Sequence, residues 1–173
     1  MAFAILRAEK LKTMGNIGGS LAHNYRTIDT PNANPSQTPN NFHSLKDSEA
    51  VKAAISERLP EKRRSDAVLC VEYMITASPE WQGWNDERQN EYFKQAVDWL
   101  EQRHGKHNVV ATSIHRDETT PHLIAYVVPL DQDTGKLNAK KFLGGKAKLA
   151  EMQSSFSNHV KNLGLKRGIE GSK

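Results

Sequence analysis

The feature that most constrains the fold is a pair of apolar runs separated by a short polar segment. Residues 109–114 and 123–128 are rich in valine, isoleucine and alanine, a composition typical of buried strands. Between them, Thr119-Thr120-Pro121 favours a turn, because proline fixes its own φ and keeps the preceding residue out of the helical region. We therefore expect an antiparallel hairpin that brings the intervening polar side chains to the middle of a sheet.

Three potential metal ligands lie in this hairpin, namely His115, Glu118 and His122. Two imidazoles and a carboxylate suit Mn²⁺, Zn²⁺, Ni²⁺ or a similar divalent ion. The spacing is loose, so a polar hairpin with incidental histidines is the alternative interpretation. Alternate residues of a strand share a face, so Ile124 occupies the position where a third imidazole would complete a three-histidine site.

Composition sets broad limits on the class of protein. The chain has 173 residues, which suits one domain (residues 1–173) with a substantial core. Its single cysteine, Cys70, cannot form an internal disulfide, so we expect a reducing compartment and a cytoplasmic protein. No apolar run approaches the length of a membrane span, and no signal peptide is evident. The net charge of +4 agrees with a basic face but does not establish nucleic-acid binding.

Periodicity and capping patterns predict four strands and four helices. The strands are expected at residues 3–6, 66–76, 109–114 and 123–128. The helices are expected at residues 20–26, 47–59, 86–104 and 145–163, with a minor turn or short strand at 135–138. Residues 29–44 contain three prolines and four asparagines, so we expect a long loop of the kind that is often functional. The order predicts an α+β fold, a central antiparallel sheet with helices packed on it.

Glu72 is the unusual residue of the strand predicted at 66–76. Alternation places it on one face with Val68, Cys70 and Met74, all apolar. A buried carboxylate facing an apolar layer is costly unless it is paired. Glu72 either forms a salt bridge with a lysine or arginine, or contributes to the metal site as a ligand or as a support to one.

A second cluster is formed by His23-Asn24-Tyr25-Arg26. On a helix, His23 and Arg26 would share a face. A neutral histidine can act as a nucleophile or a base, and a guanidinium can hold a phosphate through two hydrogen bonds. Tyr25 would face elsewhere on a helix, but in a loop it could reach a phosphate as the alternative nucleophile. Without further context, an exposed capping histidine is the commoner role.

Basic and aromatic side chains near these segments suggest contacts with nucleic acid. Phe42, Trp81 and Trp84 are expected in loops, where they could stack on unpaired bases, with core packing as the alternative for the tryptophans. Several basic residues flank glycine-bearing turns, whose backbone N–H groups can bind phosphate at helix N-termini. They are Arg7, Lys10, Lys12, Lys136, Lys140, Lys141, Lys146 and Lys148. The alternative for them is a solvated surface.

Taken together, these segments resemble the relaxase domain of the MobV (Mob/Pre) plasmid mobilisation proteins, members of the HUH superfamily of single-strand DNA endonucleases. Four stretches carry the resemblance, in the family's order and over nearly the whole chain. They are residues 12–19 leading into 23–26, residues 34–36, residues 66–73, and residues 115–122 with 127–129. The resemblance implies an HUH relaxase-like fold.

The resemblance also implies a site- and strand-specific nickase that acts at a plasmid origin of transfer in conjugative mobilisation or plasmid recombination. His23 matches the nucleophilic histidine, which would form a 5′-phosphoramidate and leave a free 3′-hydroxyl, and Arg26 matches an arginine that neutralises phosphate charge. His115, Glu118 and His122 match metal positions, with Mn²⁺ the expected ion and Mg²⁺, Zn²⁺ or Ni²⁺ as alternatives. The implied partner is plasmid oriT DNA, its single-stranded nick region plus the adjacent hairpin. The residues expected to contact it are Lys12, Asn24, Tyr25, Lys140, Lys141 and Lys146.

Two positions depart from the family's pattern. The family commonly has a further histidine two residues after the one matching His122, where this chain has Ile124, so metal affinity is lower or Glu118 is a direct ligand. Residues 41–45 depart from an Asn-Tyr-acidic-Leu pattern, and we assign His43 no role. Full-length family members continue into a helical C-terminal region, so we interpret residues 1–173 as an isolated relaxase domain, a short member or a truncated form.

Two other functions remain open at this point. One is a non-catalytic module that recognises an origin hairpin and represses transcription, with a degenerate metal site; Ile124 keeps this hypothesis open. The other is a metal-dependent hydrolase of small substrates, which accounts for the histidines of the hairpin but not for His23, Arg26 or the lysines.

Overall fold

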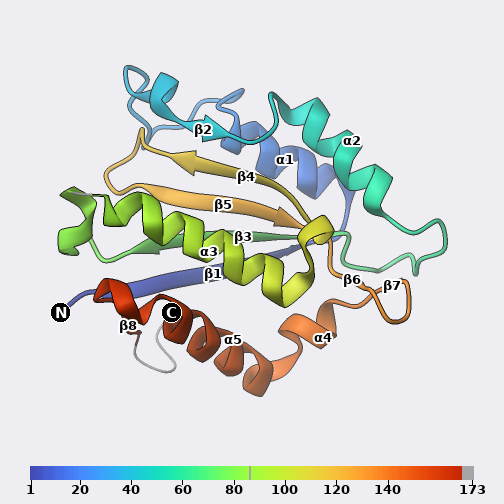
Figure 1. The fold of residues 1–173 in the computed structure, drawn as a ribbon. Coiled ribbons are helices and arrows are strands. Elements are labelled where there is room, and N and C mark those ends of the chain that lie inside the picture. Colours follow the sequence, from blue (N-terminus) through green and yellow to red (C-terminus); the bar gives the residue numbers. More distant parts are fainter. Residues whose placement is uncertain (86, 169–173) are drawn as a thin grey trace.

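The computed structural model describes residues 1–85 and 87–168. Its main sheet has six strands in the order β2-β4-β5-β3-β1-β8, and β6 pairs with β7 in a separate small sheet (Figure 1). The strands are β1 (Phe3–Leu11), β2 (Phe42–His43), β3 (Cys70–Ala77), β4 (Val109–His115), β5 (His122–Val127), β6 (Leu130–Asp131), β7 (Lys136–Leu137) and β8 (Lys166–Arg167). The α-helices are α1 (Met14–Asn24), α2 (Ser48–Arg58), α3 (Arg88–His104), α4 (Ala139–Leu143) and α5 (Gly145–Val160).

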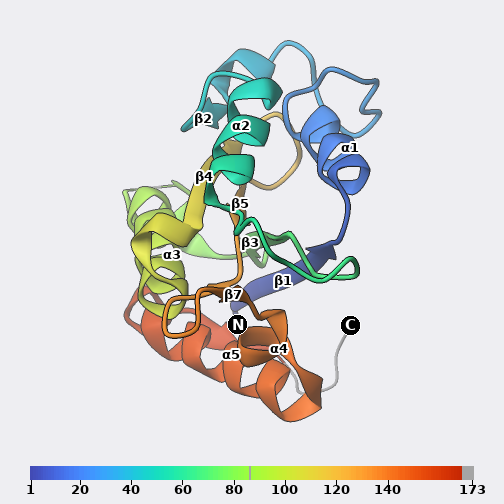
Figure 2. The ribbon, with the colours of Figure 1, turned by 90° about the vertical axis from the view of Figure 1, so that its right-hand side faces the viewer.

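Helices cover both faces of the sheet. α1 and α2 lie on one face, and α3 and α5 lie on the other (Figures 1 and 2). Each layer encloses its own hydrophobic core, one including Ile17, Leu21 and Tyr126, the other including Tyr73 and Phe156. All pairings in the main sheet are antiparallel except that of β1 with β8. The predicted α+β class, a central antiparallel sheet with helices packed on it, is confirmed.

The predicted hairpin is present as β4 and β5. Its register pairs Ile114 with Leu123 and His115 with His122, and a bulge lies near Val109 at the far end. The polar segment therefore forms the turn that joins two interior strands, at the ends of those strands rather than at the middle of the sheet.

Strand β3 begins four residues later than predicted. A turn precedes it, in which the N–H of Ala67 donates to the carbonyl of Arg64, and regular pairing with β1 starts at Cys70. The predicted alternation holds from Cys70 onward, but Val68 packs with the core on the α3 side instead. Strand β1 runs on to Leu11 instead of ending at Leu6, because its pairing with β3 continues from Ala4 to Leu11.

The prediction that a helix begins at Ser20 is wrong. α1 begins at Met14, and the side chain of Thr13 caps it by accepting a hydrogen bond from the N–H of Asn16. Its glycine-rich first half is helical because Ile17 and Leu21 are fully buried, and this packing outweighs a cost of about 1 kcal/mol for each glycine.

The other helices follow their predicted caps more closely. Asp47, the first residue of the range predicted for this helix, caps α2. α3 ends where Gly105 adopts a positive φ of 94°; its expected first residue, Asp86, lies outside the described residues. The apolar stripe of α5 is buried except for Leu149, and the short helix α4 before it was not predicted. Within residues 1–85 and 87–168, no helix is long and apolar enough to cross a membrane.

Buried His104 provides a prediction about stability. Burial, with a smaller effect of Arg103, lowers the pKa of His104 to about 3, and its Nε2 lies 2.7 Å from the hydroxyl of Tyr73. Between this pKa and the unfolded value of 6.5, only the unfolded chain binds the proton. The unfolding free energy should therefore fall as pH drops from 6.5 towards 3, by up to about 1.4 kcal/mol per pH unit from this residue.

Urea unfolding of the metal-free protein at several pH values would measure this slope. His104→Gln should flatten the slope, whereas His107→Gln, at an exposed position of the adjacent turn, should leave it unchanged. Equal slopes in the wild type and His104→Gln would contradict the prediction.

Candidate active site

The structure brings the three predicted metal ligands together at the turn between β4 and β5. His115 ends β4, His122 begins β5, and Glu118 lies in the turn between them. One ligand atom from each lies within 4.8 Å of the others. Nδ1 of His115 is 3.0 Å from Nε2 of His122, which is 3.1 Å from a carboxylate oxygen of Glu118.

Backbone carbonyls orient both imidazoles towards the common centre. Nε2 of His115 lies 3.0 Å from the carbonyl oxygen of Asn24, and Nδ1 of His122 lies 3.3 Å from that of Thr120. When these nitrogens donate, the two nitrogens that face each other present lone pairs. Two lone pairs that face each other repel, and a metal cation between them would remove this repulsion. A histidine held by a carbonyl behind it is the usual arrangement of a metal ligand.

The ionisation state of His115 also suits a metal. Burial, with smaller effects of His122 and Arg26, lowers the pKa of His115 to about 3. The imidazole is therefore neutral at physiological pH, as a metal ligand must be. We conclude that His115, Glu118 and His122 fit a divalent cation.

Arg26 places its guanidinium beside this cluster, in a conformation unusual for its residue type. Its φ is 57°, in the left-handed region. Nε and Nη2 bind the carboxylate of Asp117 at 2.8 and 2.7 Å. Nη2 also lies 3.4 Å from Nδ1 of His115 and 3.8 Å from Glu118.

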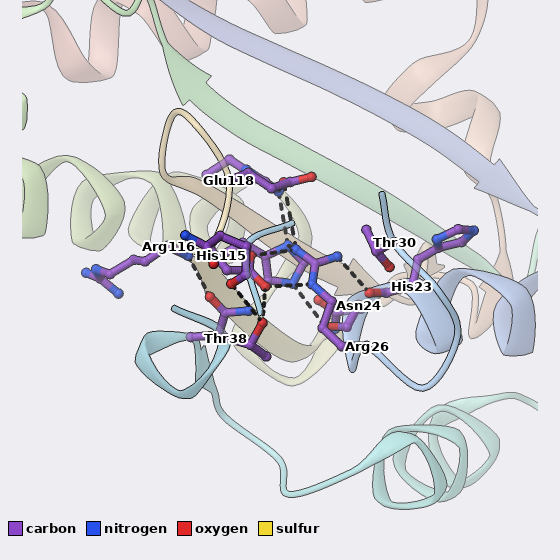
Figure 3. Close-up of polar contacts among 12 residues, drawn as sticks. His23, Asn24, Arg26, Thr30, Thr38, His115, Arg116 and Glu118 are labelled. Atoms are coloured by element: carbon purple, nitrogen blue, oxygen red, sulfur yellow. Dashed lines mark hydrogen bonds and ion pairs between the residues drawn. The ribbon is translucent and has the colours of Figure 1, made fainter. Parts of the chain in front are cut away.

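His23 lies in the last turn of α1 and is exposed. Its imidazole points away from Arg26 and His115, and only its carbonyl oxygen faces the guanidinium, 2.9 Å from Nη1 (Figure 3). No hydrogen bond reaches this imidazole from the described residues. The prediction that His23 and Arg26 share a helix face is wrong, because α1 ends at Asn24 and the chain turns sharply at Arg26.

Glu72 lies on the same sheet face but outside the metal cluster. It pairs across β3 and β5 with Tyr126, four residues along β5 from His122. The hydroxyl of Ser20 donates to its carboxylate and lies 2.7 Å from the hydroxyl of Tyr126. Burial raises the pKa of Glu72. Within the described residues, Glu72 neither forms a salt bridge with a lysine or arginine nor belongs to the metal cluster. Its carboxylate accepts a hydrogen bond from the hydroxyl of Ser20 instead.

Asn24 and Tyr25, predicted to contact DNA, are engaged within the protein. Asn24 is buried; its carbonyl orients His115, and its side-chain amide donates to the hydroxyl of Ser113. Tyr25 donates its hydroxyl to the carbonyl of Leu45 and stacks on His43 with ring centroids 4.2 Å apart. His43, to which the sequence assigned no role, lies 2.7 Å through Nδ1 from Ser113 and thus supports the same network.

The predicted basic residues are divided between the two faces of the molecule. Lys12 is exposed just before Thr13, the N-cap of α1, at the end of β1 where Leu11 pairs with Cys70, whereas the metal cluster lies at the other end of the sheet. Lys140 and Lys141 lie in α4 and Lys146 in α5, across the sheet from α1 and α2 (Figure 2). Lys141 is paired with Asp131 at 3.1 Å. The structure thus does not bring these three lysines to the metal cluster.

The aromatic residues also separate. Trp81 is buried and donates its indole N–H to the carbonyl of Leu163, and Trp84 packs against the same core. Both tryptophans therefore have the alternative role, core packing. Phe42 is half exposed on the edge strand β2, where it pairs with Ile114. Of the three aromatic residues, only Phe42 has a side chain exposed enough to meet a base.

Comparison with known proteins agrees with this geometry. The family model for Mob_Pre, described as plasmid recombination enzyme, matches residues 1–173. The chain belongs to the Mob_Pre family.

Among curated relatives, a 65 kDa protein of Zymomonas mobilis is 36% identical over 99% of this chain and 30% of its own length. Plasmid recombination enzyme type 1 of Staphylococcus aureus is 30% identical over 97% of this chain and 45% of its own. This chain thus spans less than half the length of either relative.

A solved structure supports the fold assignment. The Mn-bound crystal structure of the MobM relaxase domain (MOBV; Mob_Pre) with plasmid pMV158 oriT DNA superposes with a TM-score of 0.83. It is 30% identical, and the match covers 99% of this chain and 93% of that one. The relaxase-like fold expected from the sequence is confirmed.

The two carboxylates, Glu118 and Glu72, should differ in their effect on metal binding. Losing a group that merely orients a ligand costs about 10- to 100-fold in affinity, so losing a ligand should cost at least as much. Glu118→Gln should therefore weaken Mn²⁺ binding by about tenfold or more in isothermal titration calorimetry. Glu72→Gln is the matched control and should bind as the wild type does. A weakened Glu72→Gln with an unchanged Glu118→Gln would reverse the assignment.

Position 124 should accept an additional ligand. Ile124 lies two residues from His122 on the same face of β5, opposite Ser113 and Met74, and it is 8% exposed. Ile124→His should raise Mn²⁺ affinity by about tenfold, equivalent to about 1.4 kcal/mol. Ile124→Gln controls for polarity without an imidazole and should not raise the affinity. Equal affinities of the two variants would show that position 124 does not face the metal.

Proposed function

We propose that residues 1–173 form a relaxase domain, a site- and strand-specific, metal-dependent DNA endonuclease and strand transferase. Its substrate is plasmid origin-of-transfer DNA, comprising a single-stranded nick region and the adjacent hairpin, and its role is conjugative mobilisation or plasmid recombination. The observation that carries the proposal is the cluster of His115, Glu118 and His122 beside Arg26, in a fold shared with an oriT-bound relaxase domain. Because plasmid DNA is cytoplasmic, we assign the protein to that compartment.

The proposed nucleophile is His23. One ring nitrogen of the neutral imidazole attacks the scissile phosphorus, and an N–P bond replaces the P–O bond to the 3′ oxygen. The leaving oxygen takes up a proton and becomes a free 3′-hydroxyl, and the attacking ring loses its own N–H proton to solvent. The DNA remains attached through a 5′-phosphoramidate, and the reverse reaction rejoins or transfers the strand. The exposure of His23 leaves it free to turn towards a bound strand.

The other groups would bind and stabilise the phosphate. A divalent ion held by His115, Glu118 and His122 would supply positive charge that polarises the phosphate and stabilises the transition state. Mn²⁺ is the ion we favour, with Mg²⁺, Zn²⁺ or Ni²⁺ as alternatives, since the donor set suits each of these ions in some degree. Arg26 keeps a guanidinium next to this position, where it can donate to phosphate oxygens.

The second candidate is a non-catalytic DNA-binding or repressor module that recognises the origin hairpin. Two observations favour it. Ile124 removes a potential ligand from the metal face, and the imidazole of His23 points away from the metal cluster (Figure 3). A covalent adduct separates this candidate from the enzyme, because a binding module forms none.

Incubation with Mn²⁺ and a single-stranded oligonucleotide containing the cognate origin should give a covalent adduct on a denaturing gel. His23→Ala should reduce adduct formation by about a thousandfold or more, as expected for loss of a nucleophile. Tyr25→Phe should retain it, because the hydroxyl of Tyr25 is bound to Leu45.

The chemistry of the adduct gives an independent check. A phosphoramidate hydrolyses in acid far more readily than a phosphotyrosine, so the adduct should disappear on brief acid treatment. An acid-stable adduct lost in Tyr25→Phe would identify the tyrosine as the nucleophile. Tight binding of the same DNA without any adduct would support the binding module.

A further inference from the structure

Asp117 is the least accessible acidic side chain near the metal cluster, and it was not among the residues predicted for the site. Its side chain is fully buried in the turn between β4 and β5. Its carboxylate accepts two hydrogen bonds from Arg26 and one, of 2.9 Å, from the hydroxyl of Thr38. Its backbone carbonyl accepts a fourth, from the N–H of Asn34. These partners all belong to residues 26–38, which precede Asp117 by about eighty residues or more.

The contacts keep Asp117 ionised. The Arg26 guanidinium holds the pKa of the Asp117 carboxyl well below its usual range, and the hydroxyl of Thr38 adds to this effect. A guanidinium and a carboxylate joined by two parallel hydrogen bonds have a defined relative orientation, which a single ion pair lacks. Arg26 also keeps a left-handed backbone, which a residue with a large side chain retains only where its surroundings hold it.

The same guanidinium reaches both halves of the site. Nη2 faces His115 and Glu118, whereas Nη1 donates to the carbonyl of His23, in the turn that carries the proposed nucleophile. Figure 3 shows the Arg26 guanidinium between His115 and Glu118 on one side and His23 on the other. The orientation of Arg26 thus affects the metal ligands and the end of α1 together.

We propose that Asp117 is a positioning residue of the nicking reaction. Its carboxylate holds the Arg26 guanidinium beside the metal ligands and fastens residues 26–38 to the same end of the sheet. The effect of Asp117 on nicking rests on the proposed function. Its effect on the position of the Arg26 guanidinium can be measured without nicking. Without Asp117 the guanidinium would take several positions, and a displacement of about 1 Å in a reacting group can cost about 100-fold in rate.

Asp117→Asn keeps the shape of the side chain and removes its charge. In the full protein with Mn²⁺, its single-turnover nicking rate at saturating DNA should fall by about 100-fold, while DNA affinity stays within about threefold. Combined with Arg26→Gln, it should slow nicking no further than Arg26→Gln alone, because Asp117 acts through Arg26. A purely structural role would instead multiply the two effects.

Thr38→Val is the milder companion variant and carries the test if Asp117→Asn does not fold. It removes one hydrogen bond to the carboxylate and should slow nicking by about tenfold, a free-energy difference of about 1.4 kcal/mol. Thr27→Val is its matched control, since the hydroxyl of Thr27 bonds to Ala22 and does not contact Asp117. Equal rates for these two variants, or wild-type nicking by Asp117→Asn, would overturn the proposal and leave the nickase function intact.

A second readout does not require nicking. The Nε–H signal of Arg26 in an NMR spectrum of ¹⁵N-labelled protein, assigned by its loss in Arg26→Gln, should be protected from exchange with water. It should broaden or exchange in Asp117→Asn and persist in His23→Ala, which cannot form the adduct. If the wild type forms no adduct, the proposed function and the reaction role of Asp117 both fail. The Nε–H signal then still decides whether Asp117 holds Arg26.

Discussion

The pairing of His115 with His122 across β4 and β5 is the constraint on which the rest of the site depends. Side chains on adjacent strands share a face only when the register is correct, and a shift of one residue would turn one imidazole to the opposite core. The alternation of buried residues along both strands maintains this register, since Leu123 and Ala125 pack on the α3 side while Ile124 and Tyr126 pack on the α1 side. The same packing that stabilises the sheet thus sets the spacing of the metal ligands.

Charge around the cluster is arranged in successive layers. The ligands present two imidazoles and one carboxylate, and the positive guanidinium of Arg26 lies beside them. Asp117 compensates this guanidinium from within the protein, so the positive charge remains fixed although it is largely shielded from water. Two groups that would be costly to bury separately are stable as a hydrogen-bonded pair with further donors to the carboxylate.

The sequence predicted the parts of the fold whose patterns are local. The hairpin of β4 and β5 and the helix after Asp47 follow from runs of apolar residues and a capping side chain. The start of α1 was missed because glycines signal flexibility, whereas here burial of Ile17 and Leu21 decides the conformation. The short helix α4 lacked a long enough pattern to be recognised.

In the site, too, local patterns were predicted from the sequence and contacts between distant residues were not. The spacing along one hairpin suggested His115, Glu118 and His122. The partners of Glu72 and Asp117 come from residues more than fifty positions away, and no periodicity reports such contacts. The nearest available signal for Asp117 was its position beside two metal-ligand candidates, which does not distinguish a buried anchor from an exposed turn residue.

The separation in sequence between contacting groups also bears on how the molecule assembles. The metal ligands lie within one hairpin, whose short loop closes at a small entropic cost, whereas the contact between Arg26 and Asp117 spans 91 residues. Local pairings generally form faster than distant ones. The metal-binding half of the site can therefore take shape in a nascent hairpin, and the half that carries His23 is completed only when the segment around Arg26 reaches that hairpin.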